Sequence, residues 1–318
     1  MNSVKKIRLA LLCGGKSSER EVSLSGAKGV LDALNRNKYD VEVFDTATDL
    51  PRLMERTKSL DVAFILLHGR FGEDGTVQGL LELLSIPYQG SGVLGSALAM
   101  NKHFSKVMYR DAGIPTPDWL VYTDADEYRI EEIPERLGLP VMIKPANQGS
   151  SIGMAKVERM EDMLSAIREA SKWDEQVVLE RFVRGRELTA GVLGLKELTA
   201  LPIVEIRPNP SYSFFDYEAK YQKGATEELC PAPIPEKIAK RAQDLAVRAH
   251  RALGLRGYSR TDMILTETEE LFVLETNTIP GMTPTSLLPQ AAQAMGIGFS
   301  ELLDKLIAMA LDAHKPDR

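Results

Sequence analysis

Two short polar runs in the last quarter of the chain have the residue types and spacing of a metal site. They are residues 260–262 (Arg-Thr-Asp) and 275–277 (Glu-Thr-Asn), each at or near the end of an apolar stretch typical of a strand. Residues two apart on a strand share one face. On neighbouring strands, Asp262, Glu275 and Asn277 would present oxygen ligands together, which suits Mg²⁺ bound jointly with nucleotide phosphates. Spacing alone is equally compatible with a solvated strand end.

A second candidate for nucleotide chemistry is a lysine followed by a turn that contains glycine. Lys144 ends an apolar stretch, and residues 147–151 (Asn-Gln-Gly-Ser-Ser) come shortly after it. Such a turn can offer backbone N–H groups to phosphates, although an ordinary hairpin has the same composition. Neither this loop nor residues 14–18 (Gly-Gly-Lys-Ser-Ser) matches a Walker site or a dinucleotide fingerprint.

The elements that must position these residues begin with an alternation of strands and helices. Residues 7–12, 41–44 and 62–67 are apolar runs typical of strands, and helical stripes are centred on Leu24 to Leu34 and Val77 to Leu84. This alternation predicts a parallel sheet with helices on both faces. We expect this first domain to end near Ala97.

Beyond this point the pattern changes to short strands, with the loop of residues 147–151 as a flap and a longer loop as a lid. Strands are predicted at residues 141–144, 154–157, 177–180, 258–265 and 271–275, and helices at 160–167 and 238–253. The stretch from Pro208 to Glu227 is long, aromatic and without period, and such loops are usually functional lids or disordered. The aromatic residues that favour a lid are Phe214, Phe215, Tyr217 and Tyr221.

Composition narrows the function further. The chain has 318 residues, which suits two or three domains around a cleft, and 39 basic against 45 acidic residues, which argues against a nucleic-acid surface. Cys13 and Cys230 form no metal or disulfide pattern. Residues 5–13 imitate a signal peptide, but the apolar run is too short, and no segment is long enough to span a bilayer. We expect a cytoplasmic protein without membrane or nucleic-acid partners.

Five segments, in sequence order, resemble the signatures of the D-alanine–D-alanine ligases, a family with the ATP-grasp fold. They are residues 14–23, 67–75, 149–154, 217–221 and 275–283. Together they are far more specific than any one short motif. The resemblance implies an α/β (α+β) chain with an N-terminal Rossmann-like domain (1–97), a central ATP-grasp subdomain (98–187) and a C-terminal one (188–318) with the lid loop 208–227.

The resemblance also implies roles for individual residues in binding the two amino acids. Glu19 would receive the ammonium of the first D-alanine, with Ser150 and Tyr221 hydrogen-bonded to it and His68 nearby. Arg260 and the Gly281 N–H would stabilise the oxyanion, and Ser286 would bind the second carboxylate. Simpler interpretations compete: a helix N-terminal charge for Glu19, a helix cap for Ser286 and a core histidine for His68.

For the nucleotide, the resemblance implies that lysines hold the phosphates, that Glu180 and the Val183 backbone hold the adenine, and that Glu187 holds the ribose. The lysines are Lys102, Lys144 and Lys220, and the ligands of Mg²⁺ or Mn²⁺ are Asp262, Glu275 and Asn277.

The implied reaction joins two D-alanines through a D-alanyl phosphate formed from ATP, supplies peptidoglycan synthesis and is carried out by a homodimer. One alternative is a related ligase with D-lactate or another amino acid as second substrate, although Tyr221 favours an amine. Another is a non-catalytic ATP-binding relative, which should lack a metal ligand or the arginine, and none is missing. A Rossmann dehydrogenase ranks last because its glycine fingerprint is absent.

Overall fold

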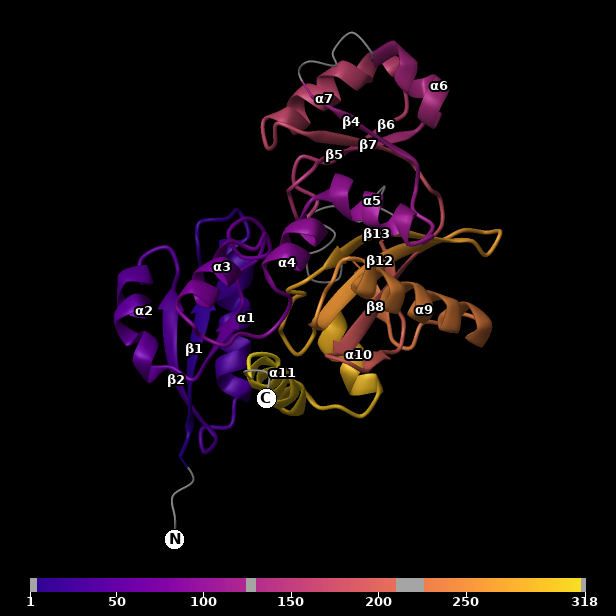
Figure 1. The fold of residues 1–318 in the computed structure, drawn as a ribbon. Helices are drawn as coiled ribbons and strands as arrows, with labels where there is room; N and C mark the ends of the chain where they lie inside the picture. Colours follow the sequence, from indigo (N-terminus) through magenta and orange to yellow (C-terminus); the bar gives the residue numbers. More distant parts are fainter. Residues whose placement is uncertain (1–4, 124–129, 210–225, 316–318) are drawn as a thin grey trace.

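Three β-sheets, each from a different part of the chain, form the framework of the protein (Figure 1). In the computed structural model, the residues that the structure describes are 5–123, 130–209 and 226–315. None of the helices in these ranges is long and apolar enough to cross a membrane.

The first sheet is parallel, as predicted, with the order β2-β1-β3. Its strands are β1 (Ile7–Cys13), β2 (Tyr39–Asp45) and β3 (Val62–Ile65). Leu9 to Cys13 and all of β3 are buried because helices cover both faces of a parallel sheet. The helices and the short 3₁₀ turn that alternate with these strands are α1 (Arg20–Ala33), α2 (Leu50–Arg56), η1 (Thr57–Ser59) and α3 (Thr76–Leu83).

The second sheet is antiparallel, with the order β4-β7-β5-β6, and it lies at the top of Figure 1 under α7 and α6. The strands predicted at residues 141–144, 154–157 and 177–180 are confirmed as β5, β6 and β7. The elements are β4 (Trp119–Tyr122), α6 (Ile133–Leu137), β5 (Val141–Pro145), β6 (Ala155–Val157), η3 (Met160–Asp162), α7 (Met163–Ser171) and β7 (Val177–Arg181).

The third sheet has six strands, with β8 and β12 at its centre, and α9 packs against it. Its strands are β8 (Arg186–Gly194), β9 (Leu198–Ala200), β10 (Val204–Pro208), β11 (Thr226–Leu229), β12 (Gly257–Leu265) and β13 (Leu271–Asn277). Among the described residues, this part of the chain contains the helices α9 (Glu236–Ala252), α10 (Leu287–Ala294) and α11 (Phe299–Ala313). The strands predicted at residues 258–265 and 271–275 are confirmed as β12 and β13, and the helix predicted at 238–253 is confirmed as α9.

Two consecutive helices, which the sequence patterns did not predict, connect the first sheet to the other two. They are α4 (Val93–Met100) and α5 (Lys102–Asp111), separated by Asn101. The side chain of Asn101 caps α5 by accepting a hydrogen bond of 3.0 Å from the Phe104 N–H. Helix α5 lies between the second and third sheets (Figure 1).

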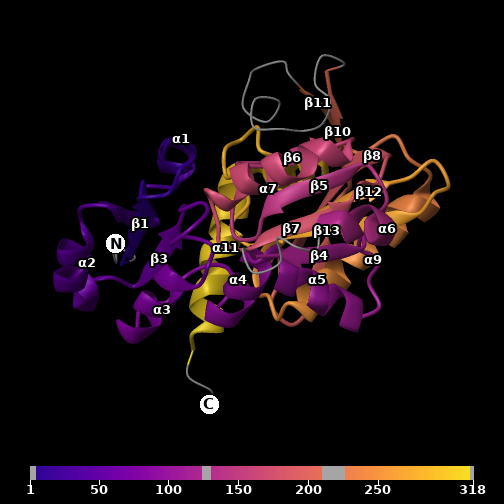
Figure 2. The same cartoon turned by 90° about the horizontal axis from the view of Figure 1, so that it is seen from above.

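One hydrophobic core is shared between the first and third sheets. It contains Leu9 and Phe64 of the first sheet, Tyr258 of β12, and Leu302 and Leu306 of α11. Figure 2 shows α11 running between the two parts of the molecule. The four-stranded sheet has a core of its own, with α7 packed on it. The first and third sheets therefore form one block, and the second sheet is a separate layer above it.

Candidate active site

The predicted metal ligands lie together on β12 and β13. The two strands are antiparallel neighbours, and Asp262 is directly opposite Glu275, as Arg260 is opposite Asn277. The Arg260 guanidinium donates two bonds to the Asp262 carboxylate, of 2.9 Å and 2.7 Å. Although burial lowers the pKa of Arg260, the Asp262 charge more than compensates and raises it, so this buried guanidinium stays charged.

The chemistry of this cluster fits a magnesium ion that is bound both by the protein and by the phosphates of a nucleotide. Asp262 and Glu275 are carboxylates, and Asn277 donates from its amide nitrogen to Asp262 Oδ2 at 3.0 Å, which leaves the amide oxygen for a cation. Within the described ranges, no group of three His, Cys, Asp or Glu side chains is arranged to hold a metal. A magnesium ion here would therefore take further oxygen ligands from phosphates and water.

A cavity between the second and third sheets collects half of the sequence-predicted site residues. Its apolar walls include Met142, Phe182 and Leu274. The predicted residues that line it are Lys102, Lys144, Ser150, Glu180, Val183, Glu187, Asp262 and Glu275. Apolar walls beside an array of charges suit a ligand with a flat ring at one end and phosphates at the other.

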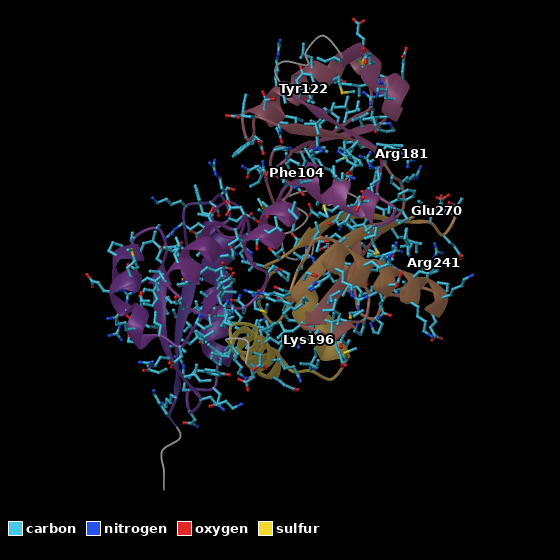
Figure 3. All side chains as sticks on the ribbon, in the orientation of Figure 1. Phe104, Tyr122, Arg181, Lys196, Arg241 and Glu270 are labelled. Carbon is cyan, nitrogen blue, oxygen red and sulfur yellow. The ribbon has the colours of Figure 1, made fainter. Side chains whose placement is uncertain are left out.

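The two sheets that enclose this cavity also contact each other directly. Arg181, at the end of β7, places its guanidinium 5.4 Å from the centre of the Phe272 ring on β13. Figure 3 labels Arg181 at this junction. This cation–π contact joins the second sheet to the third.

Glu180 is held by two lysines, of which the sequence analysis identified only one. Lys144 Nζ lies 2.6 Å from Glu180 Oε1, and Lys106 Nζ lies 2.6 Å from Glu180 Oε2. Burial alone would raise the pKa of Glu180, but the two ammonium groups outweigh it and hold that pKa below its usual value. Burial also lowers the pKa of Lys106, to about 8. The adenine contact predicted for Glu180 would thus come from an ionised carboxylate.

Lys102, the first residue of α5, connects the flap to the metal cluster. Its Nζ donates to the Gln148 carbonyl at 2.5 Å and lies 3.5 Å from Glu275 Oε2. Its backbone N–H donates to the Ala146 carbonyl at 2.9 Å. The ammonium group therefore lies between the loop predicted to contact phosphates and a predicted magnesium ligand.

Glu19 is buried against the flap, although the two are 131 residues apart in the sequence. It directly precedes α1, but its carboxylate accepts no bond from the helix backbone, and the Ser150 hydroxyl donates to it instead. A Cβ on Gly69 or Gly149 would lie 2.5 Å or 2.8 Å from Glu19 Oε2. Ser150 itself has a left-handed φ of +50°, as strained residues at functional sites often do.

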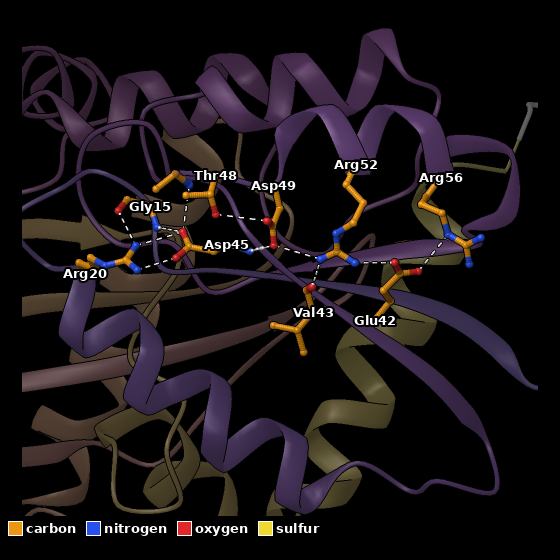
Figure 4. Close-up of polar contacts among 10 residues, drawn as sticks. Gly15, Arg20, Glu42, Val43, Asp45, Thr48, Asp49, Arg52 and Arg56 are labelled. Atoms are coloured by element: carbon orange, nitrogen blue, oxygen red, sulfur yellow. Dashed lines mark hydrogen bonds and ion pairs between the residues drawn. The ribbon is translucent and has the colours of Figure 1, made fainter.

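A polar network fixes the loop that carries Glu19 (Figure 4). The Arg20 guanidinium donates to Asp45 Oδ1 at 3.0 Å and to Asp45 Oδ2 at 2.5 Å, and the Gly15 N–H donates to Asp45 Oδ1 at 3.1 Å. These bonds hold the pKa of Asp45 well below its usual range. The start of α1 is thus tied to the end of β2, which positions Glu19.

Two further titratable side chains lie near Glu19. Burial lowers the pKa of His68, and its Nε2 atom has no hydrogen-bond partner among the described residues. Glu73, which the sequence analysis did not single out, accepts bonds from the Gly69 N–H at 2.8 Å and from the Ile279 N–H at 3.2 Å. Burial, followed by the charge of Glu19, raises the pKa of Glu73 to about 8.

Gly281 and Ser286 lie close to each other but do not line the cavity. A Cβ on Gly281 would lie 3.0 Å from Ser286 Oγ. Ser286 precedes α10 without capping it, since its hydroxyl accepts a bond of 3.1 Å from the Thr283 N–H. Ser286 thus occupies the N-cap position of α10, but its side chain makes no capping hydrogen bond. Tyr221 and Lys220, and most of the lid loop 208–227, lie outside the described residues.

The chain matches known protein families over nearly its whole length. The family model described as D-ala D-ala ligase C-terminus matches residues 108–308, and the one described as D-ala D-ala ligase N-terminus matches residues 8–51 and 46–91. The D-alanine--D-alanine ligase of Desulfotalea psychrophila is 54% identical over 312 residues, which are 98% of this chain and 97% of that protein.

Solved structures agree with the sequence relatives. The D-alanine--D-alanine ligase from Bacillus anthracis complexed with ATP superposes with a TM-score of 0.85 at 35% identity, covering 97% of this chain and 98% of that one. The VanG D-Ala:D-Ser ligase from Enterococcus faecalis superposes with a TM-score of 0.84 at 34% identity, covering 96% and 100%. These similarities confirm the ATP-grasp fold expected from the sequence.

Proposed function

The chain belongs to the D-alanine–D-alanine ligase family, and on this premise we propose that it joins two D-alanines to D-alanyl-D-alanine, with ATP converted to ADP and phosphate. The enzyme uses ATP and Mg²⁺, and its product supplies peptidoglycan for the cell wall. The observation that carries this proposal is the cavity in which Lys102 and Lys144 face the Asp262–Glu275 pair.

The first step activates a carboxylate, which by itself is a poor acylating agent. The carboxylate of the first D-alanine attacks the γ-phosphorus of ATP, giving D-alanyl phosphate and ADP. Lys102 and Lys144 neutralise phosphate charge, and Lys220 joins them from the lid. Asp262, Glu275 and Asn277 would hold the magnesium ion, which would supply positive charge next to the phosphate oxygens. Val183 and Glu180 contact the adenine, and Glu187 contacts the ribose.

The second step forms the peptide bond. The deprotonated amine of the second D-alanine attacks the carbonyl carbon of the acyl phosphate; the C–O bond to phosphate then breaks, and the departing phosphate takes up the proton that the nitrogen loses. Arg260 and the Gly281 N–H stabilise the oxyanion, and Arg260 is preorganised because Asp262 holds it by two hydrogen bonds. Ser286 binds the carboxylate of the second D-alanine.

The first substrate is held at the other end of the site. Glu19 receives the ammonium group, and Ser150 fixes the Glu19 carboxylate. His68 lies beside them, and Tyr221 closes the lid over the bound substrate. Water would destroy the acyl phosphate, so a closed lid protects the intermediate.

We propose a three-part division of the chain at residues 1–97, 98–187 and 188–318, in agreement with its three sheets. The joins fall inside α4 and at the start of β8.

We also propose that the enzyme works in the cytoplasm, where ATP is supplied, and that it is a homodimer. Leu83 and Leu94, on the contacting helices α3 and α4, are 87% and 71% exposed and offer an apolar surface for a second copy. Light scattering of Leu94→Asp tests the dimer.

Product analysis tests the proposed reaction. Phosphate release from Mg²⁺–ATP would be measured with D-alanine, with L-alanine, and with D-alanine plus D-lactate or D-serine, and products would be identified by mass spectrometry. D-alanyl-D-alanine formed with one phosphate per dipeptide is the expected result. A mixed product formed in preference would favour the alternative ligases, and no turnover by folded protein would favour a non-catalytic relative.

A further inference from the structure

Lys106 is a fully buried ammonium group that the reaction described above does not use. It is 1% exposed and does not line the cavity. Its Nζ donates to Thr116 Oγ1 at 2.7 Å and to the Pro117 carbonyl at 3.1 Å, and it lies 2.6 Å from Glu180 Oε2. Lys106 is thus anchored by two hydrogen bonds and forms a close ion pair with Glu180.

Lys144 is bound differently, although it contacts the same carboxylate. It lines the cavity, and within the described ranges its only hydrogen bond from Nζ goes to Glu180 Oε1, at 2.6 Å. Two of its N–H donors therefore remain for a ligand. When a nucleotide binds, its phosphates compete with Glu180 for the Lys144 charge.

This competition creates an electrostatic problem for Glu180. The Glu180 carboxylate is 2% exposed, and a buried charge without a partner is strongly destabilising. If Lys144 were its only counter-ion, transfer of Lys144 to phosphate would be opposed by the charge left behind. Lys106 does not line the cavity and is anchored to Thr116 Oγ1 and the Pro117 carbonyl, so it stays in place when Lys144 moves.

We propose that Lys106 is the permanent counter-ion of Glu180 and thereby a positioning residue for nucleotide binding, because it lets Lys144 turn to phosphate without leaving a buried carboxylate unpaired. The inference rests on the proposed ATP-dependent function. Under this proposal, the buried face of α5 contributes to nucleotide affinity although Lys106 does not contact the nucleotide.

The test is a double-mutant cycle on nucleotide binding. The Kd of a non-hydrolysable ATP analogue with Mg²⁺ would be measured calorimetrically for wild type, Lys106→Met, Glu180→Gln and the double variant. Lys106→Met should raise the Kd by at least about tenfold. With Glu180→Gln as the background, the same substitution should change the Kd by less than about threefold, because a neutral amide needs no counter-ion.

Steady-state kinetics and a milder variant separate this role from a general loss of structure. Lys106→Met should raise the KM for ATP and leave kcat within about threefold, since Lys106 touches no reacting atom. Thr116→Val removes one hydrogen bond that anchors Lys106, so it should also raise the Kd, but by less than Lys106→Met. This variant keeps the test decisive if Lys106→Met fails to fold.

Equal losses of affinity in both backgrounds, or an unchanged Kd in folded Lys106→Met and Thr116→Val, would overturn the inference. Failure of the wild-type protein to bind the nucleotide at all would instead overturn the proposed function, and this inference with it.

Discussion

Replacement of Gly149 by alanine should weaken binding of the first D-alanine while leaving the fold intact. The new Cβ would lie 2.8 Å from Glu19 Oε2, whereas ordinary contacts begin at 3.4 Å, so the carboxylate must move by about 0.6 Å. The atom that must move is the end of a flexible side chain, so the effect on stability should be small. The displaced carboxylate would lose its aligned contact with the substrate ammonium.

The size of the effect follows from the strength of such a contact. A hydrogen bond to a charged group contributes about 1.5–3 kcal/mol, which corresponds to a rise of roughly 10- to 150-fold in the KM for the first D-alanine. The assay is phosphate release at varied D-alanine and saturating ATP, with thermal unfolding measured in parallel. Gly149 itself lines the nucleotide cavity, so the KM for ATP is measured as well, and the rise in the KM for D-alanine should be the larger of the two.

Gly79→Ala is the matched control for this substitution. Its Cβ would meet Val93 Cγ2 at 3.8 Å, an ordinary contact, within helix α3. It should leave both KM values unchanged. A Gly149→Ala protein that unfolds at the wild-type temperature and keeps the wild-type KM for D-alanine would refute the placement of the substrate ammonium at Glu19.

Three more substitutions probe other parts of the site. Arg260→Lys should lower kcat by about 10²–10³, because lysine cannot both pair with Asp262 by two bonds and face the oxyanion; a kcat near wild type would contradict this. Asn277→Ala should raise the Mg²⁺ concentration for half-maximal activity by at least about tenfold, and an unchanged requirement would exclude Asn277 as a ligand. Glu73 has a pKa raised from 4.5 to about 8, so the folded protein holds this proton more tightly than the unfolded chain. Stability should therefore fall as pH rises from about 4.5 to 8, and Glu73→Gln should flatten this fall in denaturant titrations; an identical slope would argue against the raised pKa.

Much of the fold follows from hydrophobic periodicity, because the relevant segments are buried on predictable faces. Strand β1 is apolar from Leu9 to Cys13, and β12 and β13 place their polar pairs at spacing two. The pairing of Asp262 with Glu275 needed only the assumption that these strands are neighbours, which the register confirms. The proximity of Glu19 to Ser150 could not be derived in this way, because no local pattern relates residues 131 positions apart.

Helix α5 was not predicted from the sequence, and its buried face explains why. Its buried residues are Lys102, Ser105, Lys106 and Tyr109, which have the spacing of one helical face. That face is polar, so a search for apolar stripes finds no helix there. Polar residues at core spacing conflict with the usual pattern, and such conflicts are expected at functional sites.

The same polar face explains how the cavity is held together. Lys106 pairs with Glu180 of the second sheet, whereas Lys102 lies 3.5 Å from Glu275 of the third, and the Tyr109 hydroxyl donates to Thr276 Oγ1 at 2.8 Å. One helix thus contacts both sheets that line the nucleotide cavity, through charges that would be destabilising if unpaired. An apolar face on α5 would supply neither the phosphate contact proposed for Lys102 nor a counter-ion for Glu180. If the proposed roles of Lys102 and Lys106 hold, the polar residues on the buried face of α5 couple the packing of this helix to nucleotide binding.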